Sequence, residues 1–223
     1  MTAAAWLTEA CLAAVLALLV VDRLGWPIGR VVAKLAASTG FVLVALALGA
    51  TGTRYGQLIL GALLLGWVGD ALLLSRAAKA FLGGLGAFLL SHLLFAAAFA
   101  TGALSLPAMG VAAVVALVFG AVVLRWLLPH TPAAMRVPVL AYVVVILAMC
   151  ITAAGHAVAT QRWMVLLGAV LFAASDIAVA RDRFVRPGFI NQLWGWPAYF
   201  VAQLVLAWTV VGATALQSTA RGG

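Results

Sequence analysis

Charged residues are scarce in this 223-residue chain, and acidic residues are the scarcest of them. Only 8% of the residues are charged, with five Asp and Glu against thirteen Lys and Arg, whereas 67% are hydrophobic. A soluble globular domain carries about 25% charged residues, so this composition excludes that class. A disordered chain is excluded as well, because disordered segments are poor in apolar residues.

The chain also has few residues of the kinds that bind metals or form nucleophilic sites. Its two cysteines, Cys11 and Cys150, lie in separate apolar stretches and form no CxxC pair. The sequence contains no HExxH or other compact His/Cys spacing, no P-loop and no Gly-x-Ser-x-Gly turn. We therefore expect no metal, no cofactor and no disulfide, and we expect both cysteines to pack as small apolar residues.

Long apolar runs dominate what is present. A helix that spans a bilayer needs about 20 mostly apolar residues, and such runs recur from one end of the chain to the other. The connections between them are short, so the sequence predicts an all-α polytopic membrane protein with one transmembrane domain over residues 1–223. The eight predicted spans are residues 3–21, 29–48, 57–74, 80–101, 107–128, 137–155, 163–180 and 197–216.

The basic residues predict how this bundle sits in the membrane. Short loops on the cytoplasmic side of a membrane carry an excess of Lys and Arg. Connections 1, 3, 5 and 7, with Lys34 just inside the second span, hold ten of the thirteen bases, which places both termini outside. Anionic lipid headgroups, rather than nucleic acid, are then the expected partners. The ten are Arg23, Arg30, Lys34, Arg76, Lys79, Arg125, Arg136, Arg181, Arg183 and Arg186.

The first apolar stretch is expected to remain as the first span. No basic segment precedes it and Glu9 interrupts it, whereas a secretory signal begins with a basic region.

Two of the five acids, Asp70 and Asp176, lie inside apolar spans, where a carboxylate costs about 3 kcal/mol or more. Asp70 precedes Arg76 by six residues and Asp176 precedes Arg181 by five, so both lie within roughly 9 Å of the basic end of parallel helices. Two carboxyl groups close together in such a medium repel when both are ionised, so one keeps its proton and can act as a general acid. The alternative role for each is an interhelical ion pair or a position near the interface.

Other polar residues fall in the same layer of the predicted bundle. Each also has a structural alternative: Lys34 can extend to the headgroups, His92 can bond a neighbouring helix, and the tyrosines can anchor at the interface. We expect these side chains to line a polar pocket around the two aspartates. They are Lys34, His92, Tyr142, Ser175, Tyr199 and Gln203.

These residues by themselves allow more than one function. Intramembrane Asp and Lys also occur in proton-coupled carriers, and a lipid or ion transporter is therefore the alternative to an enzyme. Another membrane hydrolase, such as an amidase or a protease, could use the same two acids. The position of the aspartates away from the bilayer centre favours an enzyme over a carrier, whose site lies near the midplane.

In the order of its motifs the chain resembles the lysoplasmalogenase family of multi-pass membrane proteins, called YhhN-like in bacteria. The sequence departs from the family pattern at Phe95, where an aromatic residue with a hydroxyl is expected. The matching elements, in order, are Lys34; Gly69-Asp70-Ala71-Leu72-Leu73; the stripe Phe81, Gly84, Phe88 and His92; Tyr142, Ile146 and Met149; Gly168-Ala169, Phe172 and Ser175-Asp176, followed by Ala180; and Tyr199 with Gln203.

The resemblance implies an eight-helix hydrolase of a bacterial cell membrane that cleaves the vinyl ether bond of lysoplasmalogens. Its products would be a fatty aldehyde and glycerophosphocholine or glycerophosphoethanolamine. Asp70 and Asp176 would supply the acid and the base in the cytoplasmic leaflet, and which does which stays open because an interacting pair titrates as a unit. Lys34 would contact the phosphate, and the other polar residues would shape the pocket.

Overall fold

The computed structural model describes residues 2–211, and eight long α-helices hold most of them. The all-α prediction is confirmed over this range. Short 3-10 turns at Ala50–Gly52 and Leu128–His130 and a π turn, η3, at Arg181–Val185 lie between helices. The helices are α1 (Ala3–Arg23), α2 (Pro27–Ala47), α3 (Arg54–Leu72), α4 (Ala78–Phe99), α5 (Leu106–Leu127), α6 (Ala133–Thr160), α7 (Trp163–Ala180) and α8 (Phe189–Trp208).

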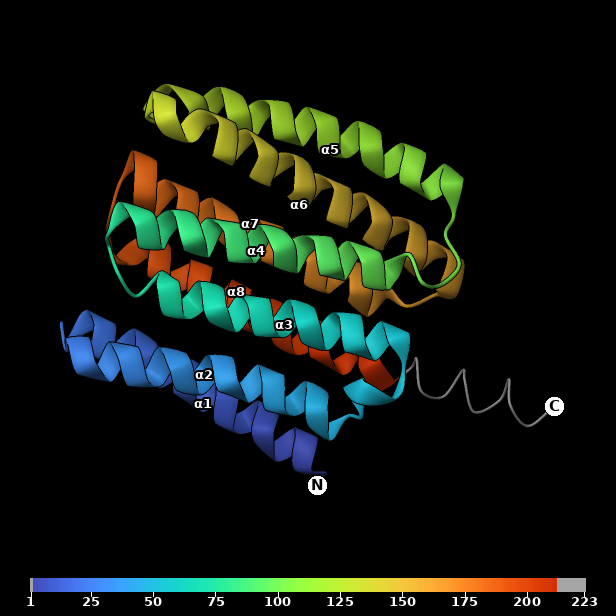
Figure 1. The fold of residues 1–223 in the computed structure, drawn as a ribbon, viewed down its shortest axis with the longest axis horizontal. Coiled ribbons are helices and arrows are strands. Elements are labelled where there is room, and N and C mark those ends of the chain that lie inside the picture. The colour runs from blue at the N-terminus through green and yellow to red at the C-terminus, as the bar shows by residue number, and fades with distance from the viewer. Residues whose placement is uncertain (1, 212–223) are drawn as a thin grey trace.

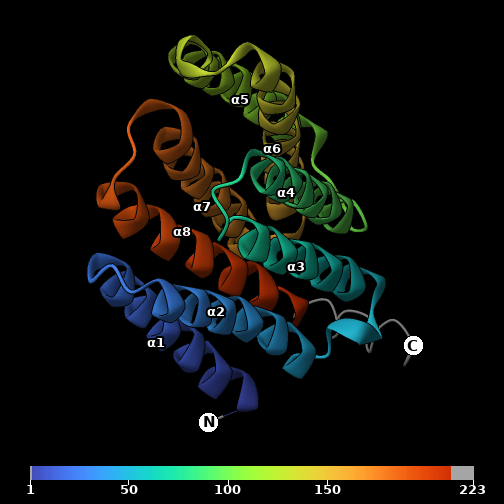
Figure 2. The same cartoon turned by 60° about the vertical axis from the view of Figure 1, so that its left-hand side comes forward.

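The helices pack as four sequential hairpins whose axes run roughly parallel to one another (Figure 1). In the figure, α5 and α6 lie along one side, α1 and α2 along the other, and the remaining four helices lie between them. Helix α8 also contacts α1, α2 and α3, and α6 contacts α4 and α7. Helix α5 packs mainly against α6, and the turned view places these two helices at the margin of the bundle (Figure 2).

Within residues 2–211, seven of the eight helices are long and apolar enough to cross a membrane, and the described part of α8 does not meet this criterion. Helix α8 carries several of the polar residues expected in the pocket, and its contacts with four other helices keep much of it away from the exterior. Side chains such as Val114, Leu117 and Val118 on α5 are exposed, as expected of a surface that faces lipid. The eight predicted spans are thus present as helices, and seven meet the requirements for spanning.

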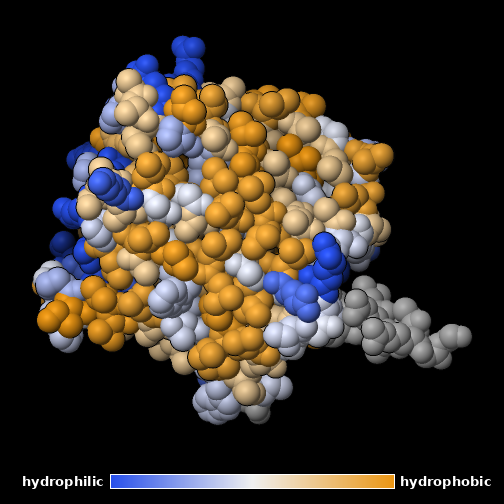
Figure 3. Space-filling model, in the orientation of Figure 1, coloured by the Kyte–Doolittle hydropathy of each residue, from blue (hydrophilic) through white to orange (hydrophobic). Residues whose placement is uncertain are grey.

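The hydrophilic surface gathers at one end of the bundle. Figure 3 shows apolar residues over most of one face and hydrophilic residues along the edge where α1 meets α2, α3 meets α4 and α7 meets α8. We call this edge the basic end; its bases are Arg23, Arg30, Arg76, Lys79, Arg125, Arg136, Arg181, Arg183 and Arg186. The bases thus lie together at one end of the bundle, as the positive-inside rule requires. That this end faces the cytoplasm stays a prediction.

Several predicted helix boundaries were wrong, and proline explains the largest error. Helix α8 begins at Phe189 rather than at Pro197, which lies inside the helix. Proline is common at the first position of a helix, which favours a start at Pro197. Packed membrane helices also tolerate an internal proline, and α8 is such a helix. Helix α6, Ala133–Thr160, extends beyond the predicted span 137–155 at both ends, and it contains Pro138, as predicted. The predicted end of the last span, Leu216, lies outside the described residues.

Two glycines of α3 allow its neighbours to approach closely. A Cβ added at Gly66 would lie 2.6 Å from Gln203 Nε2, and one added at Gly69 would lie 2.6 Å from the ring of Phe88. Real Cβ atoms do not come that close to other heavy atoms, so a larger residue at either position would displace the side chain of Gln203 or of Phe88. These contacts bring α4 and α8 against the face of α3 that carries Asp70.

Candidate functional site

Asp70 lies at the centre of a buried polar cluster that joins three helices. Its carboxyl group is 3.2 Å from Lys34 Nζ on α2, and the Ser38 hydroxyl, one turn further along α2, donates to it at 2.6 Å. The Tyr199 hydroxyl of α8 donates to the same carboxyl oxygen as Ser38, at 2.8 Å. The side chain of Asp70 is only 3% exposed and that of Lys34 only 8% exposed. The interhelical ion pair that the sequence left open for Asp70 is therefore present.

This set of partners favours the ionised form of Asp70. Burial opposes a charge on the carboxyl group, but the adjacent ammonium of Lys34 and the two hydroxyl donors each stabilise it. Gln203 Nε2 in turn donates to the Tyr199 hydroxyl at 2.9 Å, which leaves the tyrosine hydrogen directed at Asp70. The three donors, Lys34, Ser38 and Tyr199, thus hold the carboxyl group of Asp70 in one orientation.

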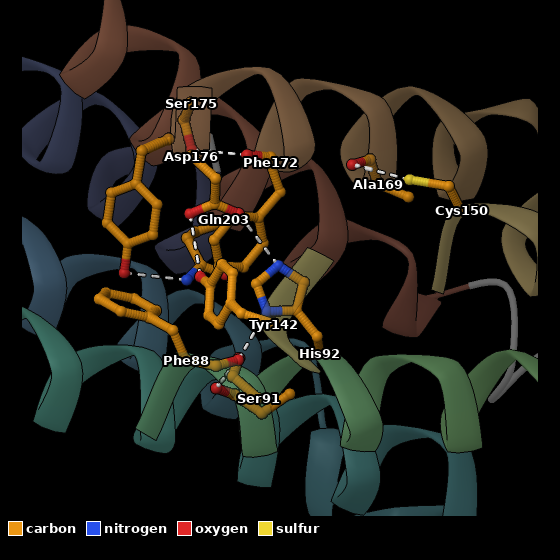
Figure 4. A network of polar contacts seen from close by, with 12 residues as sticks. Phe88, Ser91, His92, Tyr142, Cys150, Ala169, Phe172, Ser175, Asp176 and Gln203 are labelled. Atoms are coloured by element: carbon orange, nitrogen blue, oxygen red, sulfur yellow. Dashed lines mark hydrogen bonds and ion pairs between the residues drawn. The ribbon is translucent and has the colours of Figure 1, made fainter. Parts of the chain in front are cut away.

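Asp176 of α7 has a different set of partners (Figure 4). The Tyr142 hydroxyl of α6 donates to Asp176 Oδ1 at 3.0 Å, and His92 Nε2 of α4 lies 3.3 Å from Oδ2. The other ring nitrogen, His92 Nδ1, is 2.6 Å from the carbonyl oxygen of Phe88. A carbonyl oxygen only accepts, so Nδ1 carries a hydrogen.

His92 and Asp176 can therefore share one proton between them. With a hydrogen on Nδ1, the facing atom Nε2 can either accept a proton from a carboxylic acid or, in an imidazolium, donate one to a carboxylate. Nε2 and Oδ2 are close but are not aligned as a hydrogen bond, and neither atom has another hydrogen-bond partner within the described residues. Buried polar atoms are rarely left in this way, and of the two residues only Asp176 lines the cavity described below.

Aromatic rings fill the space between the two clusters. The ring centroid of Phe172 lies 4.4 Å from that of His92 and 5.4 Å from that of Tyr199. Phe88 packs edge-on to Tyr199, with centroids 5.7 Å apart. No hydrogen bond joins the two carboxyl groups in the described part of the chain, so joint action requires a substrate between them.

One cavity of about 950 Å³ brings most of the predicted site residues together. Lys34, Asp70, Tyr142, Ser175, Asp176 and Tyr199 all line it. His92 and Gln203 do not line it and lie behind Asp176 and Tyr199 respectively. This volume is at the upper end of the range for small-molecule sites.

The rest of the cavity is apolar and extends away from the basic end between three helices. Its walls come from α5, α6 and α7, and α5 contributes small residues such as Ala116 and Gly120. Val170 and Leu166 of α7 lie near the far end of the cavity. Leu166 precedes Asp176 by ten residues, so the two are about 15 Å apart along the helix. A molecule with a polar head and one long apolar chain matches this shape.

The structure also shows what the sequence reasoning overestimated and what it missed. The hydroxyl of Ser175 donates to the carbonyl of Phe172 on its own helix, at 2.7 Å, so its hydrogen is already used within α7. Ser38 was missed, although its position one helical turn after Lys34 was a usable signal. Three arginines on the cavity wall, Arg30, Arg76 and Arg183, were counted only as topology signals.

Within residues 2–211 no group of three or more His, Cys, Asp or Glu side chains could hold a metal ion.

Comparisons with known proteins match this chain to one family. The sequence model of the YhhN family matches residues 4–210. Two proteins named Lysoplasmalogenase, from Mycobacterium bovis and Mycobacterium tuberculosis, are each 37% identical over 175 residues, which is 76% of this chain and 66% of theirs. A human protein named Lysoplasmalogenase TMEM86B is 35% identical over 152 residues, covering 68% of this chain and 62% of its own. The chain thus matches slightly less than two thirds of each relative's length, and no solved structure matches it.

Proposed function

Because this chain belongs to the YhhN family, we propose that it is a membrane hydrolase that cleaves the vinyl ether bond of lysoplasmalogens. The products are a fatty aldehyde and glycerophosphocholine or glycerophosphoethanolamine. The named relatives support the reaction, because all three carry the name lysoplasmalogenase. One observation carries the proposal: Asp70 and Asp176 line the same cavity, at the polar end of its long apolar part.

The shape of the cavity orients the substrate. The alkenyl chain lies between α5, α6 and α7, where the walls are apolar, and the glycerol headgroup lies toward the basic end. The vinyl ether then passes between Asp70 and Asp176. Since the basic end is expected to face the cytoplasm, the substrate enters sideways from the cytoplasmic leaflet.

Hydrolysis of a vinyl ether begins with the transfer of a proton to its β-carbon. This step creates an oxocarbenium ion, and water then adds to the cationic carbon and loses a proton to a base. The resulting hemiacetal collapses to the aldehyde and the free hydroxyl of the glycerol, so that one water molecule is consumed. The site must therefore supply one acid and one anion, and general acid–base catalysis of this kind contributes about 10²–10⁴-fold.

The two clusters suit these two roles. We assign the proton transfer to Asp176, because it lines the cavity, His92 Nε2 lies 3.3 Å from its Oδ2 atom, and Oδ2 has no hydrogen-bond partner within the described residues. We assign the anion to Asp70, because Lys34, Ser38 and Tyr199 favour its ionised form. The Asp70 carboxylate stabilises the oxocarbenium ion and accepts the proton of the attacking water.

The direct test uses purified protein in detergent with lysoplasmenylcholine, and aldehyde release is measured. Asp70→Asn and Asp176→Asn should each reduce the rate at least about a hundredfold, with the thermal midpoint recorded to show that the variants fold. Glu9→Gln is the matched control, because Glu9 is exposed on α1 and does not line the cavity. Near-full activity in either Asn variant contradicts the two-aspartate mechanism. Transport of lysolipid across liposomes without aldehyde release would instead support a carrier.

A further inference from the structure

Three arginines line the cavity at the basic end, and the acid–base chemistry does not use them. Arg30, Arg76 and Arg183 stand on its wall together with one acid of the same region, Asp182. With Asp22, which pairs with Arg30, three positive and two negative charges leave an excess of one positive charge in this region. Asp182 is already occupied, because its Oδ1 atom accepts the backbone N–H of Gly188 at 3.0 Å and an Asn191 N–H at 2.9 Å.

Arg30 has a donor that lacks an acceptor. Its Nη1 atom lies 3.6 Å from Asp22 Oδ1, but its Nε atom is buried and has no hydrogen-bond partner within the described residues. Arg30 lies at the junction of the main cavity and a second, more polar cavity that Asp22 also lines. A buried N–H of a guanidinium normally has an acceptor, and an anionic oxygen is the one it prefers.

Arg183 and Arg76 are held next to each other. The π turn after α7 carries Arg183, whose guanidinium carbon lies 4.3 Å from the ring centroid of Phe81. One of its N–H groups donates to the carbonyl oxygen of Arg76 at 3.4 Å. The Phe81 ring covers one face of the guanidinium and leaves its other N–H edges available, which is the way Arg presents itself to phosphate.

We infer that Arg30, Arg76 and Arg183 bind the phosphate diester of a lysophospholipid and so select phospholipids over neutral ether lipids. This inference rests on the proposed function and names the group by which the same site recognises its substrate. Lys34 was the residue expected from the sequence to contact the phosphate, but its ammonium is already paired with Asp70. Arg76 lies beyond the end of α3, the helix that carries Asp70, and Arg183 lies in the π turn that follows α7, the helix that carries Asp176, so both bases stand nearer the basic end than the acids. The glycerol backbone separates the ether oxygen from the phosphate in the same order.

Binding can be measured separately from hydrolysis with a substrate analogue that cannot react. The probe is 1-alkyl-glycerophosphocholine, a saturated ether lysolipid, added to the detergent-solubilised protein while intrinsic tryptophan fluorescence is recorded. The double variant Arg76→Gln/Arg183→Gln should raise the Kd at least about tenfold, because each arginine loses a charge-assisted hydrogen bond. The control is Lys79→Gln/Arg125→Gln, which removes two positive charges from the same end but from residues that do not line the cavity. The control should bind as tightly as the unaltered protein.

A second probe separates the phosphate from the chain. 1-Alkylglycerol has the same apolar chain without the phosphate, and its Kd should be the same for the double variant and the unaltered protein. Equal losses for both probes would overturn the inference, since the substitutions would then have damaged the channel. An unchanged Kd for 1-alkyl-glycerophosphocholine would overturn it as well.

The source of the phosphate is tested by competition. Inorganic phosphate should displace the lysolipid only at concentrations far above the Kd of the lysolipid, because it gains nothing from the apolar channel. Displacement at similar concentrations would identify a site for free phosphate and contradict the lipid assignment. If the unaltered protein binds the lysolipid in an arginine-dependent manner but releases no aldehyde from lysoplasmenylcholine, the headgroup site stands and the proposed reaction fails.

Discussion

The ion pair between Lys34 and Asp70 gives the most direct test of the protonation states assigned to the site. The substitution is Lys34→Met, which preserves the length of the side chain and removes its charge. At the observed separation of 3.2 Å the attraction between the two charges is about 5 kcal/mol for an effective dielectric constant near 20. Removing one member of a buried pair costs about 3–5 kcal/mol, because the other charge remains buried without compensation.

We expect the lower end of this range, because Ser38 and Tyr199 still donate to the carboxylate. A loss of about 3 kcal/mol corresponds to a fall of roughly 6–12 °C in Tm for a chain of this size. Thermal unfolding in detergent, followed by tryptophan fluorescence, measures it. Lys79→Met is the control, since Lys79 is exposed at the start of α4, and its Tm should change little.

A double substitution tests whether the unpaired charge of Asp70 causes the fall in Tm. Lys34→Met combined with Asp70→Asn removes both charges, so it should recover most of the lost Tm while aldehyde release stays abolished. A Tm for Lys34→Met within about 2 °C of the unaltered protein would refute the reasoning, because less than about 1 kcal/mol would then be lost. Asp70 would in that case be a neutral acid, and its assigned role as the anion would be wrong.

Three further changes test the second carboxyl group, the helix approach and the channel. Tyr142→Phe removes the hydroxyl that donates to Asp176, and kcat for aldehyde release should fall about tenfold or more. Gly66→Ala places a methyl carbon 2.6 Å from Gln203 Nε2, so we expect both Tm and activity to fall as the Gln203 amide is displaced from the Tyr199 hydroxyl. Val170→Trp fills the apolar end of the channel, and the preferred chain length, measured as kcat/KM over a series of lysoplasmenylcholines, should become shorter.

Each of these changes has a matched control elsewhere in the chain. Tyr55→Phe removes a hydroxyl that bonds Thr209 and not a carboxylate. Gly86→Ala adds a methyl group where nothing lies within 4 Å. Leu167→Trp enlarges an exposed residue of α7 that does not line the cavity. A control that matches the effect of its test variant would show that the change acts through general stability rather than through the site.

Composition and the positions of the charged residues were enough to predict the class of fold and to single out the two intramembrane acids. A chain with 67% hydrophobic residues in runs of helix length has to be a bundle in a membrane, because its backbone groups can be satisfied there only within regular elements. The same medium makes a charge expensive, so Asp70 and Asp176 stood out without any knowledge of their neighbours. Their distance from the basic end followed from counting residues along two helices.

The partners of Asp70 and Asp176 depend on how the helices pack, and they could not be predicted from the sequence. Lys34, Ser38 and Tyr199 meet Asp70 from two other helices, and that meeting depends on how α2, α3 and α8 cross, which spacing along one helix cannot give. The close approach of Gln203 on α8 to Gly66 on α3 likewise depends on how these two helices pack. Two aspartates that looked equivalent in sequence thereby acquired different surroundings, one beside an ammonium and one beside an imidazole.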